Sequence, residues 1–251
     1  MSEFVQSLAR GISVVRSFSA EAPRQTLSDV ARSTGLTRAT ARRLLLTLEE
    51  LGYVRSNGRY FELTARILDI GYSYVASLNL NDIAQPFLES FSEVVRESSS
   101  VSVLDDTDIV YIARVPTKRI MTVAIGLGSR FPAFQTSMGR VLLAELDDSE
   151  VLGLFDRSDR TQATEHTVTT PKALLEHIHA IRQQGWALVD QELEIGVRSL
   201  AAPLRDAVGT AIAAMNVSTH VGRTSLDELT AEFLPRLLDT ASGISRALAM
   251  R

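Results

Sequence analysis

The chain has 251 residues, of which 45% are hydrophobic and 22% charged, and its formal net charge is −4. This composition indicates a folded globular protein and excludes an intrinsically disordered one. Cysteine is absent, which excludes disulfides and thiolate metal sites. No apolar run approaches about 18 residues and the N-terminus lacks a signal-peptide pattern, so we expect no membrane segment and a cytoplasmic location.

Charge is unevenly distributed along the chain. Residues 1–65 contain nine Arg and no Lys against six acidic residues, a net charge of +3, whereas the remainder carries −7. A basic head on an acidic body is expected when one domain alone meets phosphate groups. Chance scatter of charge is the alternative explanation.

Three helices are predicted near the N-terminus. Apolar residues at helical spacing predict a helix over 4–18, and the polar, proline-containing stretch 19–26 predicts a loop. Thr26 and Asp29 form a capping-box pattern for the next helix, which a glycine ends. After a tight turn, a third helix is predicted over 37–51.

A hairpin and a connecting helix complete this region. An Asn-Gly turn within 53–63 predicts the hairpin, because both residues tolerate positive φ angles. Helix, helix, tight turn, helix and hairpin is the layout of a winged helix-turn-helix, although such domains do not all bind DNA. An amphipathic helix over 63–78 follows, and we expect it to connect two domains.

The helix over 37–51 has an apolar stripe and a basic half. The residues predicted to face the core are Ala41, Leu44, Leu45, Leu48 and Leu51. Arginines crowd its first two turns and acids lie in its last turn, opposite to the order that the helix dipole favours. Phosphate or guanine as a partner explains this placement, whereas a solvated outer face is the ordinary alternative.

The predicted DNA-binding residues are Thr37, Arg38, Ala39, Thr40, Arg42, Arg43 and Arg59. Arg38 and Arg42 share one face and are candidates for guanine edges, because a guanidinium matches O6 and N7. Thr37 caps the helix, Thr40 would reach a phosphate or a thymine methyl, and Arg43 would hold phosphate. Arg59 follows the wing turn and would contact the DNA backbone or the minor groove.

The rest of the chain predicts an α+β domain on a largely antiparallel sheet. Strands are expected over 100–104, 109–115, 120–126, 186–190 and 211–218. Helices are expected over 83–95 (interrupted early by Pro86), 137–145, 148–156, 171–184 and 226–248.

Two features of this domain allow two interpretations each. Thr136 would cap the helix that follows it, and the free N–H groups there would hold a carboxylate; a plain capped helix is the alternative. Arg198 would neutralise a second carboxylate, or would form a surface ion pair with Glu192 or Glu194.

No pattern predicts an enzyme. Ser137 lacks the Gly-x-Ser-x-Gly elbow of serine hydrolases, and His177 and His179 face different ways on a helix. We therefore expect no catalytic residues, no metal site and no cofactor.

Several motifs carry a family resemblance. "SLARGISVVRSF", "LSDVARSTGLTRATARRLLLTLEELGYV" and "LTARILDIGYSYV" resemble the DNA-binding domain and linker of IclR-type transcriptional regulators. "GSRFPAFQTSMGRVLLA" and "GWALVDQELEIGVRSLAAPLRDAVGTAIAAMNVS" continue the resemblance over nearly the whole chain. "TSMGRVLLA", "LVDQELEIGVRSLAAPLRD" and "AAMNVSTH" are closer still to regulators of protocatechuate, 4-hydroxybenzoate and β-ketoadipate catabolism.

The resemblance implies a winged helix-turn-helix domain over 1–63, a linker helix over 64–80 and a GAF-like effector-binding domain over 81–251. It implies a homodimer or a dimer of dimers and, as effector, a small aromatic or dicarboxylic acid. The positions that match the family's effector site are Ser137, Met138, Asp190, Ser199, Asn216 and Ser218. Met138 stands where other members have Ala, and Asn216 where they have Ser, so the effector of such a member cannot be carried over.

We therefore expect a ligand-responsive regulator that binds double-stranded operator DNA, without a membrane partner. RNA polymerase would be a further partner if the protein activates transcription; a repressor needs none. The alternative is a small-molecule sensor or enzyme whose winged-helix head makes protein contacts.

Overall fold

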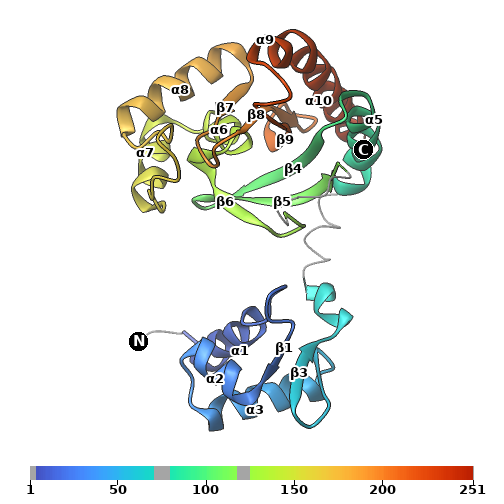
Figure 1. Cartoon of the computed structure of the whole chain (residues 1–251), viewed down its shortest axis with the longest axis vertical. Coiled ribbons are helices and arrows are strands. Elements are labelled where there is room, and N and C mark those ends of the chain that lie inside the picture. Colours follow the sequence, from blue (N-terminus) through green and yellow to red (C-terminus); the bar gives the residue numbers. More distant parts are fainter. Residues whose placement is uncertain (1–3, 71–79, 118–124, 251) are drawn as a thin grey trace. The chain divides into compact units, whose positions relative to one another are not determined.

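The computed structural model describes residues 4–70, 80–117 and 125–250. The chain divides into two compact units, Met1–Ser77 and Leu78–Arg251, which are the two bodies seen in Figure 1.

The first unit is a winged helix-turn-helix, as predicted. Its helices are α1 (Gln6–Arg16), α2 (Leu27–Thr34) and α3 (Arg38–Glu50), and its sheet contains β2 (Val54–Ser56), β3 (Tyr60–Leu63) and β1 (Arg24–Thr26). β3 is the central strand of the sheet. The prediction of a loop over 19–26 was wrong at its end, because Arg24 pairs with Glu62 and Thr26 with Tyr60 in a ladder that needs the distant β3.

Local signals set the ends of α2 as expected. Thr26 Oγ1 accepts from Asp29 N (3.3 Å), and the Asp29 carboxylate accepts from Thr26 N (3.1 Å), which completes the capping box. Gly35 ends the helix with a φ of 67°, a conformation that glycine adopts without strain. Ala41 and Leu45 of α3 are buried with Val14, Val30, Ala31 and Val54.

Three expectations for this unit are not met, or fall partly on residues outside the described ranges. Leu51, the residue that follows the end of α3, is 52% exposed and does not belong to the buried stripe. In the wing turn Gly58 alone has a positive φ, of 87°, while Asn57 uses its side chain to accept from the N–H groups of Arg59 and Tyr60. The helix expected over 63–78 begins as η1 (Ala65–Ile67) and continues to residue 70; residues 71–79 lie outside the described part.

The second unit is built on a six-stranded antiparallel sheet. Its strand order is β6 (Arg130–Pro132), β5 (Asp108–Val115), β4 (Ser98–Asp105), β9 (Ala211–His220), β8 (Val197–Arg205), β7 (Ala187–Asp190). Four predicted strands are present as β4, β5, β7 and β9, whereas β6 and β8 were not predicted. The strand expected over 120–126 falls mainly on 118–124, outside the described residues.

Helices cover both faces of this sheet, as Figure 1 shows. α5 (Leu80–Val95) and α10 (Leu234–Ala249) pack on one face, and α6 (Ser137–Leu143) packs on the other, preceded by the short η2 (Ala133–Gln135). α7 (Asp148–Arg157) and α8 (Pro171–Gln184) lie outside α6, and α9 (Leu226–Glu228) and η3 (Leu229–Phe233) lead into α10. Pro86 does not interrupt α5, contrary to expectation.

The alternation of the central strand separates an apolar face from a polar one. Val101 and Val103 of β4 belong to the core under α5 and α10. Ser100 and Ser102 point to the opposite face, because successive side chains of a strand alternate, and Ser102 contacts Met138 of α6. Hydroxyl groups on a buried central strand therefore face the side on which α6 lies.

Candidate nucleic-acid interface and ligand cavity

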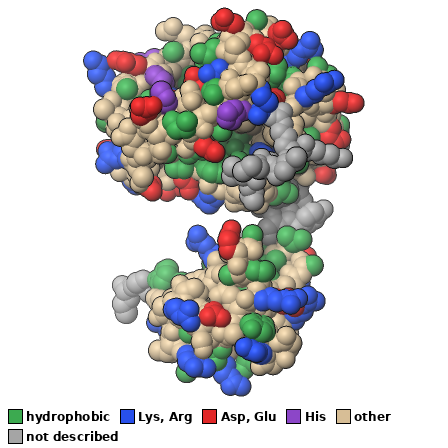
Figure 2. Space-filling view, viewed as in Figure 1, with side chains coloured by type: hydrophobic (Ala, Val, Ile, Leu, Met, Phe, Trp, Pro, Cys, Tyr) green, Lys and Arg blue, Asp and Glu red, His purple; other side chains and the backbone are tan. Residues whose placement is uncertain are grey.

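The first half of α3 presents three arginines to solvent. Arg38, Arg42 and Arg43 are exposed, and within the described residues none of them forms an ion pair, whereas Glu62 binds both Arg24 (3.0 Å) and Arg55 (2.7 Å). The three guanidinium groups of α3 are therefore available for phosphate oxygens or base edges. Figure 2 shows basic side chains gathered on the side of this unit where Figure 1 places α3.

The other predicted DNA-binding residues lie around these arginines or on the wing. Thr37 Oγ1 caps α3 by accepting from Thr40 N (3.2 Å) and donates to Thr40 Oγ1 (2.9 Å). Ala39 is exposed, and Arg59 is exposed on the wing with its guanidinium 5.1 Å from the ring centre of Tyr60. Thr40 and Arg43 also border an apolar groove of about 930 Å³ between α1 and α3.

The second unit contains a cavity of about 480 Å³ on the face of the sheet that carries α6. Apolar and aromatic side chains form much of its wall: Tyr111, Ile125, Phe131, Val189, Leu193 and Val197. The rings of Tyr111 and Phe131 meet edge to face at 5.7 Å, and burial raises the pKa of the Tyr111 hydroxyl. Such a wall suits a flat apolar body.

A guanidinium to which the described residues offer no carboxylate partner lies in this cavity. Arg114 on β5 and Asn216 on β9 both pair with Ser100 on β4, so they stand at one level of the sheet with Ser100 between them. Arg114 Nη1 donates to Ser100 Oγ (3.2 Å), and among the described residues no carboxylate lies within ion-pair distance of it. Burial lowers the pKa of Arg114, which leaves a partly desolvated cation able to gain from an anion.

Four of the six predicted effector residues line the cavity: Ser137, Ser199, Asn216 and Ser218. Asn216 Nδ2 donates to Ser218 Oγ (3.0 Å), whereas Asn216 Oδ1 and Ser137 Oγ are buried without a hydrogen-bond partner among the described residues. A buried polar atom left unpaired costs about 1–3 kcal/mol, so both atoms favour a ligand that hydrogen-bonds to them.

Met138 and Asp190 lie elsewhere. Met138 is 1% exposed and is not part of the cavity wall. Its sulfur accepts a hydrogen bond from the hydroxyl of Ser102 (3.3 Å). Asp190 is bound by Arg198 (Nε···Oδ1 2.9 Å), which also donates to Thr224 O. Arg198 therefore forms its ion pair with Asp190, and not with Glu192 or Glu194. Thr136 caps α6 through Gly139 N (3.0 Å), and a carboxylate site at that helix start stays a prediction.

Known proteins match both units. Residues 7–58 match the family described as IclR helix-turn-helix domain, and residues 72–246 match Bacterial transcriptional regulator IclR C-terminal. The chain is a member of the IclR family of transcriptional regulators.

Individual IclR-type relatives match over most of the chain. The chain is 41% identical to the Pca regulon regulatory protein of Pseudomonas putida, over 98% of this chain and 85% of that protein. A putative regulator of Rhodococcus sp. RHA1 is 54% identical with a TM-score of 0.88, over 98% and 99% of the two chains. The PobR inducer-binding domain from Acinetobacter, a double mutant in complex with 3-hydroxybenzoic acid, is 31% identical with a TM-score of 0.62, over 66% and 97%.

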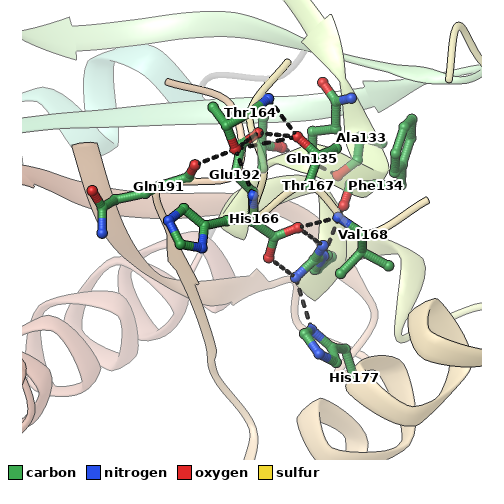
Figure 3. A network of polar contacts seen from close by, with 12 residues as sticks. Ala133, Phe134, Gln135, Thr164, His166, Thr167, Val168, His177, Gln191 and Glu192 are labelled. Atoms are coloured by element: carbon green, nitrogen blue, oxygen red, sulfur yellow. Dashed lines mark hydrogen bonds and ion pairs between the residues drawn. The ribbon is translucent and has the colours of Figure 1, made fainter. Parts of the chain in front are cut away.

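A buried polar network braces one wall of the cavity of this IclR-type regulator (Figure 3). Glu192 accepts from Arg140 through both carboxylate oxygens (2.7 and 2.6 Å) and from Val168 N (3.0 Å). The hydroxyl of Thr167 donates to Glu192 O (2.7 Å), so the turn after β7 is held at backbone and side chain. Leu193, next in this turn, faces the cavity.

Charged residues at the cavity wall were missed by sequence reasoning. Glu97, Arg114, Glu194 and Arg223 all line it, and His220 lies beside them. Arg114 lies within the strand predicted over 109–115, and a lone arginine in that apolar run was the available signal. Glu97 and Arg223 are 126 residues apart in the chain, so nothing local in the sequence indicated their contact.

Over 4–70, 80–117 and 125–250, no cluster of His, Asp and Glu has a geometry suited to a metal ion. In the same ranges, no helix has both the length and the apolar character needed to cross a bilayer.

Proposed function

We propose that this regulator binds operator DNA through the first half of α3 and that a small aromatic carboxylic acid in the sheet cavity controls this binding. The observation that carries the proposal is Arg114, a half-buried guanidinium without a carboxylate partner in the described chain, beside Tyr111 and Phe131. A carboxylate compensates such a cation, and an aromatic ring fits the wall next to it.

The polar end of the cavity supports a ring that carries a hydroxyl group. Asn216 Oδ1 is an acceptor, so it requires a donor from the ligand, and Ser137 Oγ either donates or accepts. A hydroxylated benzoic acid supplies the carboxylate, the ring and the hydroxyl. The 3-hydroxybenzoic acid complex of the 31% identical inducer-binding domain supports the same ligand class.

DNA binding by a symmetric dimer, or by a dimer of dimers, would place two copies of α3 in successive major grooves. We propose Arg38 and Arg42 for base edges, with Thr37, Ala39, Thr40, Arg43 and Arg59 around the DNA backbone. The acid would act by binding two arrangements of the dimer unequally, since a ligand without such a difference shifts no equilibrium. RNA polymerase is a further proposed partner if the outcome is activation.

Duplex binding measured with and without acid tests the proposal. Fluorescence anisotropy of a duplex from the promoter region beside the gene should show affinity that falls steeply with salt. Addition of 3- or 4-hydroxybenzoate should change that affinity, and Arg114→Gln should remove the change while DNA binding persists. The matched control is Arg157→Gln, an exposed arginine of the same unit that pairs with Asp106. If no aromatic carboxylic acid binds the protein, or if none changes its affinity for the duplex, the proposed regulation by such an acid is wrong.

A further inference from the structure

The cavity wall contains two arginines that differ in their ion pairing. Arg114 has no carboxylate within ion-pair distance in the described chain. Arg223 donates to Glu97 twice, from Nε to Oε1 (3.1 Å) and from Nη2 to Oε2 (3.4 Å). Both guanidinium groups border one space of about 480 Å³, so the difference between them decides what charge a ligand there can carry.

Burial and hydrogen bonds fix the position of the Glu97 carboxylate. Its side chain is 7% exposed, although Arg223 is 46% exposed at the edge of the cavity. Thr219 Oγ1 donates to Glu97 Oε1 (3.2 Å) and is itself within 2.9 Å of Thr224 Oγ1. A carboxylate fixed by hydrogen bonds from both Thr219 and Arg223 does not swing away when a second anion approaches.

From these contacts we infer that Glu97 is a specificity-determining residue: it occupies Arg223 and thereby restricts the cavity to ligands with a single carboxylate. The inference rests on the proposed function and chooses between the aromatic monocarboxylic and the dicarboxylic acids that the family resemblance leaves open. A single carboxylate pairs with Arg114. A second one finds Arg223 already paired with Glu97 and, at the exposed side of the cavity, meets the like charge of Glu194, which repels it at short range.

A matched pair of ligands isolates the effect of the second charge. 3-Hydroxybenzoate and isophthalate share the ring and the first carboxylate, and differ in a hydroxyl or a carboxylate at the same ring position. Titration calorimetry on the whole protein at neutral pH should give an isophthalate Kd at least about tenfold above that of 3-hydroxybenzoate, because the dianion loses the hydroxyl contact and meets repulsion.

Glu97→Gln keeps the size of the side chain and one acceptor oxygen, removes its negative charge and so frees the charge of Arg223. The ratio of the two Kd values should fall at least about tenfold in this variant and rise again in Glu97→Gln/Arg223→Gln, a reversal that a merely structural role does not produce. Glu165→Gln is the control, since Glu165 is an 83% exposed carboxylate away from the cavity wall. If Glu97→Gln does not fold, Arg223→Gln alone should raise the ratio above that of the wild type.

Three outcomes would overturn the inference, and they can be told apart. Isophthalate binding to the wild type as tightly as 3-hydroxybenzoate, or a ratio unchanged by Glu97→Gln in folded protein, would refute the role of Glu97 and leave the proposed function standing. Failure of both acids to bind the wild type would refute the proposed effector class and this inference together.

Discussion

Arg140 and Glu192 form a buried ion pair joined at two points, with Nη1···Oε1 and Nη2···Oε2 distances of 2.7 and 2.6 Å. Their side chains are 0% and 7% exposed. The pair joins α6 to the turn after β7, and each of these segments contributes to the cavity wall. The ion pair holds these two segments of the effector-binding unit together, and we expect its loss to lower the free energy of unfolding.

Removing one partner of this pair leaves a buried charge uncompensated. We expect Arg140→Met to lower the free energy of unfolding by about 3–5 kcal/mol, and Glu192→Leu to do the same. The double variant should lose much less than the sum of the two, because it buries no charge. Urea unfolding of the three variants measures this coupling, and losses that simply add would contradict it.

His177 makes the same network sensitive to acid. Its Nδ1 lies 2.9 Å from Arg140 Nη1, and because arginine is only a donor, the imidazole must be neutral to accept. Burial, followed by the charge of Arg140, lowers the pKa of His177. Stability from the neutral ring is therefore fully present above the unfolded-state value of about 6.5 and is lost as the pH falls through that value towards the lowered pKa.

Unfolding midpoints at pH 7.5 and 5.5 test this dependence. The wild type should lose more stability on acidification than His177→Gln, whose side chain still accepts from Arg140 but does not titrate. His166→Gln, at an exposed histidine, should behave as the wild type does. Equal losses in wild type and His177→Gln would rule out the proposed proton linkage.

Two helical glycines should respond oppositely to alanine. A Cβ on Gly139 of α6 would lie 2.1 Å from Ala133 O, a backbone atom of η2, whereas a Cβ on Gly153 of α7 meets nothing within 4 Å. We expect Gly139→Ala to cost at least about 3 kcal/mol through overpacking. Gly153→Ala should gain about 1 kcal/mol from helix propensity. Thermal melts of both variants decide the matter, and a tolerated Gly139→Ala would show that α6 can move away from η2.

The arginines of α3 should separate by role. Arg42→Ala should cost about 1–3 kcal/mol on the preferred operator and relax sequence preference at one base pair. Arg43→Ala should weaken all duplexes about equally and reduce the salt slope by about one. Arg32→Ala is the control, because this exposed arginine of α2 pairs with Asp29. Anisotropy titrations against operator and scrambled duplexes measure these effects; identical losses from Arg42→Ala and Arg43→Ala would remove the distinction.

What the sequence by itself determined were the features with local causes. The Thr26 capping box, the stop at Gly35 and the helix over 171–184 were all predicted and are all present, because caps, glycine φ angles and helical periodicity act within a few residues. Residue patterns also predicted the winged helix-turn-helix and the antiparallel sheet of the second unit, and the family resemblance indicated four residues of the cavity wall.

Only the tertiary structure decided the partners. β1 exists through pairing with β3, which lies far along the chain, and the three-residue β6 exists through pairing with β5. β8 pairs with its chain neighbours β7 and β9, but Pro203 and its alanine neighbours give it little strand propensity of its own. Arg198 binds Asp190, Arg223 binds Glu97, and Arg140 binds Glu192 across 52 residues. Which carboxylate each arginine meets depends on how the sheet and helices pack, and the same packing leaves Arg114 facing the cavity with no carboxylate partner from the part of the chain that the structure describes.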